Sequence, residues 1–109
     1  LSWMTEAVGN VIKNCIEHTP PQGKLYIQAS GNPLYTELQI RDTGEGIDPE
    51  DLPHLFERFY RGKNASPDSV GIGLALSRSI IEQQNGVIDV SSTLKEGSCF
   101  SIRMYHGVV

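Results

Sequence analysis

The spacing of apolar residues along the chain predicts two helices. In residues 3–18, apolar side chains recur at three- and four-residue intervals, as on one face of an amphipathic helix. These side chains are Met4, Ala7, Val8, Val11, Ile12, Cys15 and Ile16. The prolines in residues 19–23 end this helix, because proline cannot continue the helical hydrogen-bond ladder. The second predicted helix covers residues 71–85, and Gly86 is expected to form its left-handed cap.

Strand-like runs follow each predicted helix. They cover residues 24–30, 34–42, 87–93 and 98–105. Short turns separate the two runs of each pair, so we expect antiparallel hairpins. Residues 42–70 form a long loop with one helical turn, and loops of this length in compact domains are usually functional or disordered. The pattern predicts an α+β fold with the helices on one face of a sheet.

Composition narrows the class of protein. The 109 residues are expected to form one domain, 1–109, with 39% apolar and 20% charged residues, as in ordinary soluble proteins. A net charge of -4 argues against a nucleic-acid surface. Cys15 and Cys99 lack metal-site spacing and are predicted to be buried thiols. Because Leu1 opens directly into the helical pattern, we expect the chain to be a segment of a longer protein.

Asp42 is the first residue with candidate chemistry. Alternation along the 34–42 strand places it on the same face as three apolar residues. Those residues are Leu34, Leu38 and Ile40. A carboxylate on the core face costs free energy unless it is paired or faces a ligand. Gly44 and Gly46 allow a sharp turn and the close approach of a flat group, and a carboxylate suits the amine of adenine because it only accepts hydrogen bonds. The structural alternative is an Asp that caps a glycine-rich turn.

Two further elements support a nucleotide site. Glu6, Asn10 and Asn14 form a stripe on the first helix, with Asn14 at the edge of the apolar arc and Glu6 facing solvent. An amide oxygen there could bind Mg²⁺, although a helix-surface hydrogen bond is the simpler explanation of Asn14 alone. Gly71-Ile72-Gly73-Leu74 opens the second helix, where free N–H groups could bind phosphate. Neither a dinucleotide-binding fingerprint nor a Walker A loop fits this segment.

In combination, these motifs resemble the ATP-binding domain of sensor histidine kinases, within the family shared with gyrase, Hsp90 and MutL. The resemblance covers about residues 3–104. Its motifs are Glu6-x-x-x-Asn10-x-x-x-Asn14 (N box), Asp42-Thr43-Gly44-Glu45-Gly46-Ile47 (G1 box), Phe56-Glu57-Arg58-Phe59-Tyr60-Arg61 (F box), Gly71-Ile72-Gly73-Leu74-Ala75-Leu76 (G2 box) and Gly97-Ser98-Cys99-Phe100 (closing strand).

The resemblance implies a two-layer α/β sandwich, with helices on one face of a mixed, mainly antiparallel sheet, and an ATP lid at about residues 55–70. It implies that Asp42 binds the adenine amine, that Asn14 holds Mg²⁺, and that Asn10 lies near the phosphates. Arg58, Arg61 or Lys63 would lie near the γ-phosphate. The further nucleotide contacts that it implies are Gly44, Gly46, Ile47, Gly71, Ile72, Gly73, Leu74 and Ser98.

The implied reaction is transfer of the γ-phosphoryl group of Mg-ATP to a histidine on a separate helical dimerisation domain of the same protein. A response regulator would be an indirect partner, and the parent would be a membrane-bound sensor with this domain in the cytoplasm. The fragment itself is expected to be monomeric.

The sequence leaves two alternatives open. Hydrolysing relatives carry a glutamate base four residues before the Mg²⁺ ligand, where this chain has Asn10, a poor base; Glu6 would restore that pattern only by facing the core. Glu17 stands where the family often has a lysine, and Ala75 replaces a common glycine. Glu17 favours the first alternative, a degenerate domain that serves as an interaction module. The second alternative is an anti-sigma-type serine kinase on the same fold.

Overall fold

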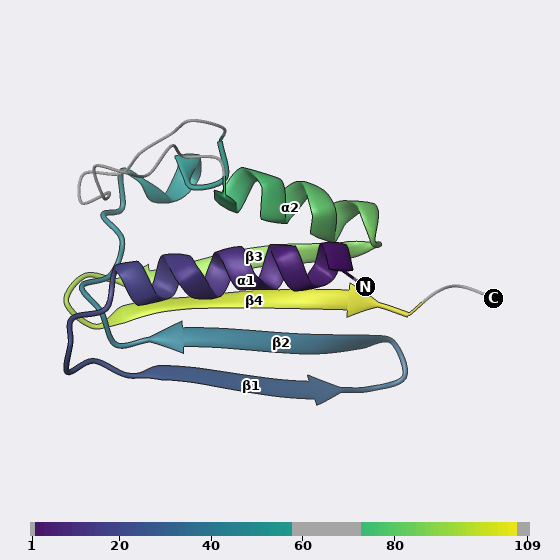
Figure 1. Ribbon diagram of the computed structural model, residues 1–109, viewed down its shortest axis with the longest axis horizontal. Helices are drawn as coiled ribbons and strands as arrows, with labels where there is room; N and C mark the ends of the chain where they lie inside the picture. Colours follow the sequence, from purple (N-terminus) through teal and green to yellow (C-terminus); the bar gives the residue numbers. More distant parts are fainter. Residues whose placement is uncertain (1, 58–72, 107–109) are drawn as a thin grey trace.

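The computed structural model describes residues 2–57 and 73–106. The described elements are α1 (Ser2–Glu17), β1 (Leu25–Gly31), β2 (Tyr35–Asp42), the 3-10 helix η1 (Leu52–His54), α2 (Gly73–Gln83), β3 (Gly86–Thr93) and β4 (Gly97–Tyr105). Both helices cover the same face of one sheet (Figure 1). The predicted α+β fold is confirmed, and the predicted elements differ from the observed ones by at most two residues where both ends are described.

The four described strands pair in the order β1-β2-β4-β3, and every pair is antiparallel. The two hairpins join through β2 and β4, which are far apart in the sequence. This pairing sets Asp42 opposite Ser98 and Ile40 opposite Phe100. The described strands therefore lack the parallel pair that a mixed sheet would contain.

The core lies between the helices and alternate residues of the sheet. Its buried members are Ala7, Val11, Cys15, Ile40, Leu74, Ile80, Ile81, Ile88, Phe100 and Ile102. The predicted helical arc is confirmed except for Ile16, which is 58% exposed near the end of α1, and the alternation of Leu38 and Ile40 is confirmed. Leu34 was assigned to the same face but is 71% exposed, because it lies in the turn that precedes β2.

A buried hydroxyl ties the two helices together. The Ser77 side chain is fully buried, and its Oγ donates a hydrogen bond of 2.8 Å to the carbonyl oxygen of Ala7. A buried hydroxyl needs such a partner, because leaving it unpaired costs free energy. Through this contact α2 is fixed against the middle of α1.

The left-handed residue that follows α2 is Asn85, with φ 65°, and the prediction for Gly86 was wrong by one position. Asparagine tolerates this conformation better than most residues. Gly86 instead begins β3, where a Cβ would lie 2.7 Å from both the Arg103 carbonyl oxygen and the Met104 sulfur. Close packing between β3 and β4 therefore explains why position 86 is a glycine.

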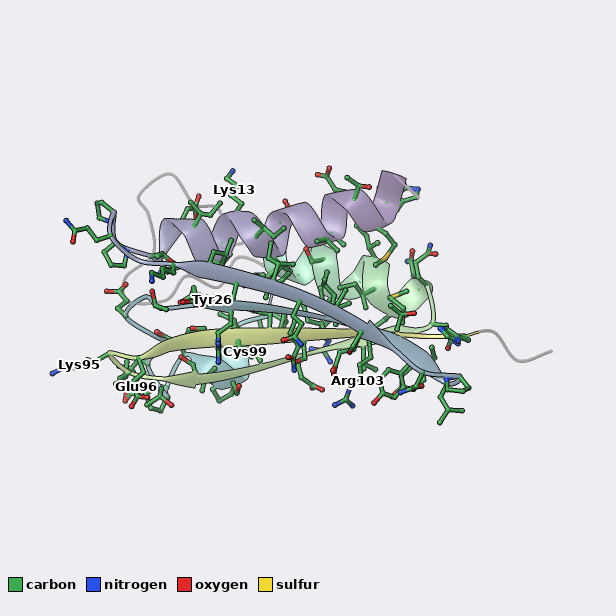
Figure 2. The ribbon with its side chains drawn as sticks, turned by 90° about the horizontal axis from the view of Figure 1, so that it is seen from below. Lys13, Tyr26, Lys95, Glu96, Cys99 and Arg103 are labelled. Atoms are coloured by element: carbon green, nitrogen blue, oxygen red, sulfur yellow. The ribbon has the colours of Figure 1, made fainter. Side chains whose placement is uncertain are left out.

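The sheet face away from the helices is mainly polar. The Arg41 guanidinium lies 5.2 Å from the centre of the Tyr26 ring, and Arg103 Nε donates to Glu37 at 3.0 Å. Cys99, which is labelled in Figure 2, belongs to this face because its neighbours in β4, Ser98 and Phe100, are buried on the other face. Both cysteines are free, as predicted, but Cys99 is only half-buried. In the described part of the chain, no helix has the length and hydrophobicity to cross a membrane.

Candidate functional site

Asp42 ends β2 on the helix-covered face and is 3% exposed. Its Oδ1 accepts hydrogen bonds from the backbone N–H of Gly44 at 2.9 Å and of Ser98 at 3.3 Å. Within residues 2–57 and 73–106, no cationic side chain forms an ion pair with it. Oriented backbone donors thus stabilise a buried carboxylate, which can direct its remaining acceptor capacity toward a ligand.

Cys15 approaches the same carboxylate from α1. Burial, together with the charge and hydrogen bond of Asp42, raises the pKa of its thiol to about 12. The thiol therefore stays protonated at neutral pH and acts as a donor to Asp42. No sequence motif pointed to this contact, which arises because α1 crosses the end of β2.

The turn after Asp42 passes between α1 and the β3–β4 hairpin. A side chain at Gly44 would collide with the carbonyl oxygen of His18, and one at Gly46 would collide with that of Thr93. Gly46 also has φ +80°, which strongly favours glycine. The predicted sharp turn is confirmed, and both glycines are required by close contacts with backbone.

The β3–β4 hairpin supports this turn from the other side. Lys95 N–H donates to the Glu45 carbonyl oxygen at 2.7 Å, and Gly97, with φ +128°, packs against the Asp42 carbonyl. Figure 2 shows Lys95 and Glu96 at the tip of this hairpin. The end of α1, the end of β2 and this hairpin gather at one end of the molecule, at the left of Figure 1.

Ile47 follows the turn and packs against the core. Its N–H donates to Ser92 Oγ at 2.7 Å. Ser92 was not among the predicted site residues, although a signal for it existed. It continues the core-facing alternation of Ile88 and Val90, so a polar side chain occurs there at a core position, as with Asp42.

The polar stripe of α1 lies as predicted. Glu6 is exposed, whereas Asn10 and Asn14 are half-buried. Asn10 also faces the start of α2, because a Cβ at Gly73 would lie 3.9 Å from Asn10 Cβ and Cγ. The structure thus brings Asn10 and the N-terminus of α2 together. Glu17 is exposed at the end of α1.

The described part of the F box contacts α2. Phe56 packs against the core, and the Arg78 guanidinium lies 5.8 Å from the centre of its ring. Leu74, in the first turn of α2, is buried in the core. Arg58, Arg61, Lys63, Gly71 and Ile72 lie outside the described residues.

Two helices packed on one antiparallel sheet are also the architecture of histidine kinase catalytic domains. The mycobacterial sensor histidine kinase MprB superposes with a TM-score of 0.86 at 30% identity, over 95% of this chain and 72% of that one. The catalytic domain of histidine kinase ThkA superposes with a TM-score of 0.82 at 23% identity, over 95% of this chain and 67% of that one.

Sequence comparison agrees with the structural one. The family model described as histidine kinase-, DNA gyrase B-, and HSP90-like ATPase matches residues 2–107, and the chain belongs to this family. The sensor protein SrrB of Staphylococcus aureus strain NCTC 8325 is 36% identical over 104 residues. That match covers 93% of this chain and 18% of SrrB, so the chain spans about a fifth of this relative. The resemblance to a histidine kinase ATP-binding domain is confirmed.

Proposed function

We propose that this domain binds Mg-ATP and supplies its γ-phosphoryl group to a histidine on a separate helical domain of the same protein. A response regulator would then receive the phosphoryl group, and the domain would act on the cytoplasmic side of a membrane-bound sensor. The observation that carries the proposal is the buried Asp42 carboxylate, held by backbone donors at one end of the domain.

At the adenine end, Asp42 would accept a hydrogen bond from the exocyclic amine of the base. Both backbone donors bind its Oδ1, which fixes the plane of the carboxylate. Ile47 would contact the face of the ring, and Gly44 and Gly46 would allow the base to approach the turn. Ser98 would line the same end through its position opposite Asp42.

At the phosphate end, Asn14 would hold Mg²⁺ and Asn10 would lie near the phosphates. Among the described residues, no group of three His, Cys, Asp or Glu side chains could hold a metal. An amide oxygen combined with phosphate oxygens and water suits Mg²⁺, which keeps several waters when it binds. The ion would neutralise phosphate charge.

The start of α2 would complete the phosphate site. Gly73 and Leu74 open this helix, where free backbone N–H groups favour an anion. In the preceding segment, Gly71 and Ile72 would extend this cradle, and Arg58, Arg61 and Lys63 would provide positive charge near the γ-phosphate. Phosphoryl transfer relies mainly on such positioning and charge stabilisation.

The contacts of α1 favour phosphoryl transfer to a protein over ATP hydrolysis. A hydrolase needs a base to activate water, and Glu6 is exposed on the side of α1 away from the core. Asn10, which lies against Gly73, is a carboxamide and cannot take that proton effectively.

Thermal unfolding with and without Mg-ADP tests nucleotide binding. At a ligand concentration of about 100 times Kd, binding should add about 2.7 kcal/mol to the free energy of unfolding. For a domain of this size, the expected rise in Tm is about 10 °C or more. An unchanged Tm at millimolar Mg-ADP would contradict the proposal and favour an interaction module.

The kinase step needs a separate experiment on the full-length parent protein. With γ-labelled ATP, we expect acid-labile label on a histidine, and we expect Asp42→Asn to reduce it strongly at ATP concentrations near the wild-type Kd. Release of labelled inorganic phosphate without labelled protein would identify a hydrolase instead.

A further inference from the structure

Ser92 lies near the end of β3, with its side chain on the helix-covered face of the sheet. It is half-buried and adjoins the turn after Asp42 as well as the first residues of β4. Neither the nucleotide-binding motifs nor the roles proposed above use this hydroxyl. Its hydrogen bonds nevertheless join the two segments that carry the proposed adenine contacts.

The first of these hydrogen bonds holds the turn. Ser92 Oγ accepts the N–H of Ile47 at 2.7 Å, which is as short as the other hydrogen bond from the hairpin, between Lys95 N–H and the Glu45 carbonyl. Because residues 43–47 belong to no helix or strand, such contacts determine where the turn lies.

The second contact reaches β4. Ser92 Oγ lies 3.1 Å from the Gly97 carbonyl oxygen and 3.2 Å from Ser98 Oγ. A hydroxyl has one proton and two acceptor lone pairs, so Ser92 can accept from Ile47 while it donates to one of these oxygens. The residue after Gly97 supplies the N–H that donates to Asp42 Oδ1.

We infer that Ser92 is a positioning residue for the adenine site, which sets Ile47 and Asp42 at a fixed separation through its two hydrogen bonds. This inference rests on the proposed function, in which Asp42 accepts the adenine amine and Ile47 contacts the ring. Loss of the hydroxyl would free the turn from β4. The Asp42 carboxylate and the Ile47 side chain would then no longer be held in the relative position that binding one adenine base requires.

The test compares ADP with inosine diphosphate (IDP), in which an oxygen acceptor replaces the amine. In Ser92→Ala, we expect the preference for ADP over IDP to fall about 3- to 10-fold, consistent with loss of one hydrogen bond. Ser92→Thr keeps the hydroxyl on a side chain that suits a strand, and it should restore most of the preference. Both affinities are measured by calorimetry well below Tm, with Mg²⁺ present.

Ser77→Ala is the control, because it removes another serine hydroxyl, a fully buried one that donates to a carbonyl oxygen. It should lower Tm without changing the ratio of ADP to IDP affinity. If Ser92→Ala fails to fold, Ser92→Cys replaces it; its weakly accepting thiol should lower the preference as well.

The outcomes separate this inference from the function on which it rests. A wild-type domain that binds ADP and IDP equally would contradict the role of Asp42, and the inference with it. A wild-type preference for ADP that Ser92→Ala leaves unchanged, together with a lower Tm, would overturn the positioning role alone. Equal losses in Ser77→Ala and Ser92→Ala would overturn it too.

Discussion

At the scale of single residues, Asp42 has two kinds of neighbour. Backbone N–H groups and the Cys15 thiol hold the carboxylate, and the proposed ligand is a base that donates a hydrogen bond. Removing the side chain would disturb both functions. A substitution that keeps one acceptor oxygen and changes the other atom can separate them.

Asp42→Asn provides this separation. Its amide oxygen can still accept from Gly44 and Ser98, whereas its NH₂ group would face the adenine amine, donor against donor. Loss of a charge-assisted hydrogen bond of about 1.5–3 kcal/mol should weaken ADP binding about 10- to 150-fold. IDP should bind this variant better than ADP does. Calorimetry with both nucleotides would detect the reversal, and unchanged ADP affinity would mean that another residue recognises the base.

The raised pKa of the Cys15 thiol predicts that the stability of the domain depends on pH. The pKa of its thiol is raised from 9.0 to about 12 by burial and by Asp42. Between these values the folded domain keeps a proton that the unfolded chain loses, so the free energy of unfolding falls as pH rises through this window. Below pH 9, the contribution of the protonated Cys15 thiol to the free energy of unfolding is fully present.

The slope from this one group is at most about 1.4 kcal/mol per pH unit. Urea unfolding of the wild type and of Cys15→Ala at pH 8, 9 and 10 would measure it, because other titrating groups cancel in the difference. We expect the wild type to lose stability faster above pH 9. Parallel pH profiles of the two proteins would contradict this prediction.

At the scale of elements, the β3–β4 hairpin and the turn after β2 fit together through glycines. Gly97 has a left-handed φ, and a side chain there would collide with the Asp42 carbonyl oxygen. Gly9 offers a contrast within α1, because a Cβ there would have no atom within 4 Å. Glycine is therefore required at position 97, whereas at position 9 it only weakens the helix.

Opposite effects on stability are therefore expected. Gly97→Ala should lower the free energy of unfolding by about 2 kcal/mol or more, because strain and collision add. Gly9→Ala should raise it by about 0.5–1 kcal/mol, since alanine forms helices better than glycine. Urea denaturation midpoints would measure both changes. Equal midpoints for the two variants would show that the hairpin adjusts to the added methyl group.

At the scale of the whole molecule, the chain carries a net charge of -4 and is proposed to bind a polyanion. Cations must offset this repulsion locally. Asn14 is half-buried on α1, and its amide oxygen is the ligand proposed for the Mg²⁺ ion. Removal of Mg²⁺ should therefore lower the affinity of the domain for nucleotide.

Melting curves with ADP should thus depend on magnesium. Chelation with EDTA should remove most of the ADP-induced rise in Tm in the wild type. In Asn14→Ala, the ADP-induced rise in Tm should be smaller when Mg²⁺ is present, and EDTA should change it very little. The Tm of this variant without nucleotide should differ little from that of the wild type. A rise in Tm in Asn14→Ala that remains fully sensitive to EDTA would place the metal on another residue.

Both predicted helices and all four strands are present, because hydrophobic period is a local property of the chain. The burial of Asp42 and the exposure of Glu6 followed from the same periodicity. Some predictions failed where neighbours in space matter, as two positions illustrate. Leu34 precedes the paired part of β2, and Gly86 is a glycine because of β4 rather than because of the end of α2.

The sequence by itself determined the elements, the helix-facing side of the sheet and the motifs that indicate a nucleotide site. Tertiary structure decided which residues support that site. The pairing of β2 with β4 brings Ser98 to Asp42, and the crossing of α1 brings Cys15 there. Ser92 reaches Ile47 across 45 residues of sequence. Such contacts depend on how strands and helices pack, and no local pattern of side chains specifies them.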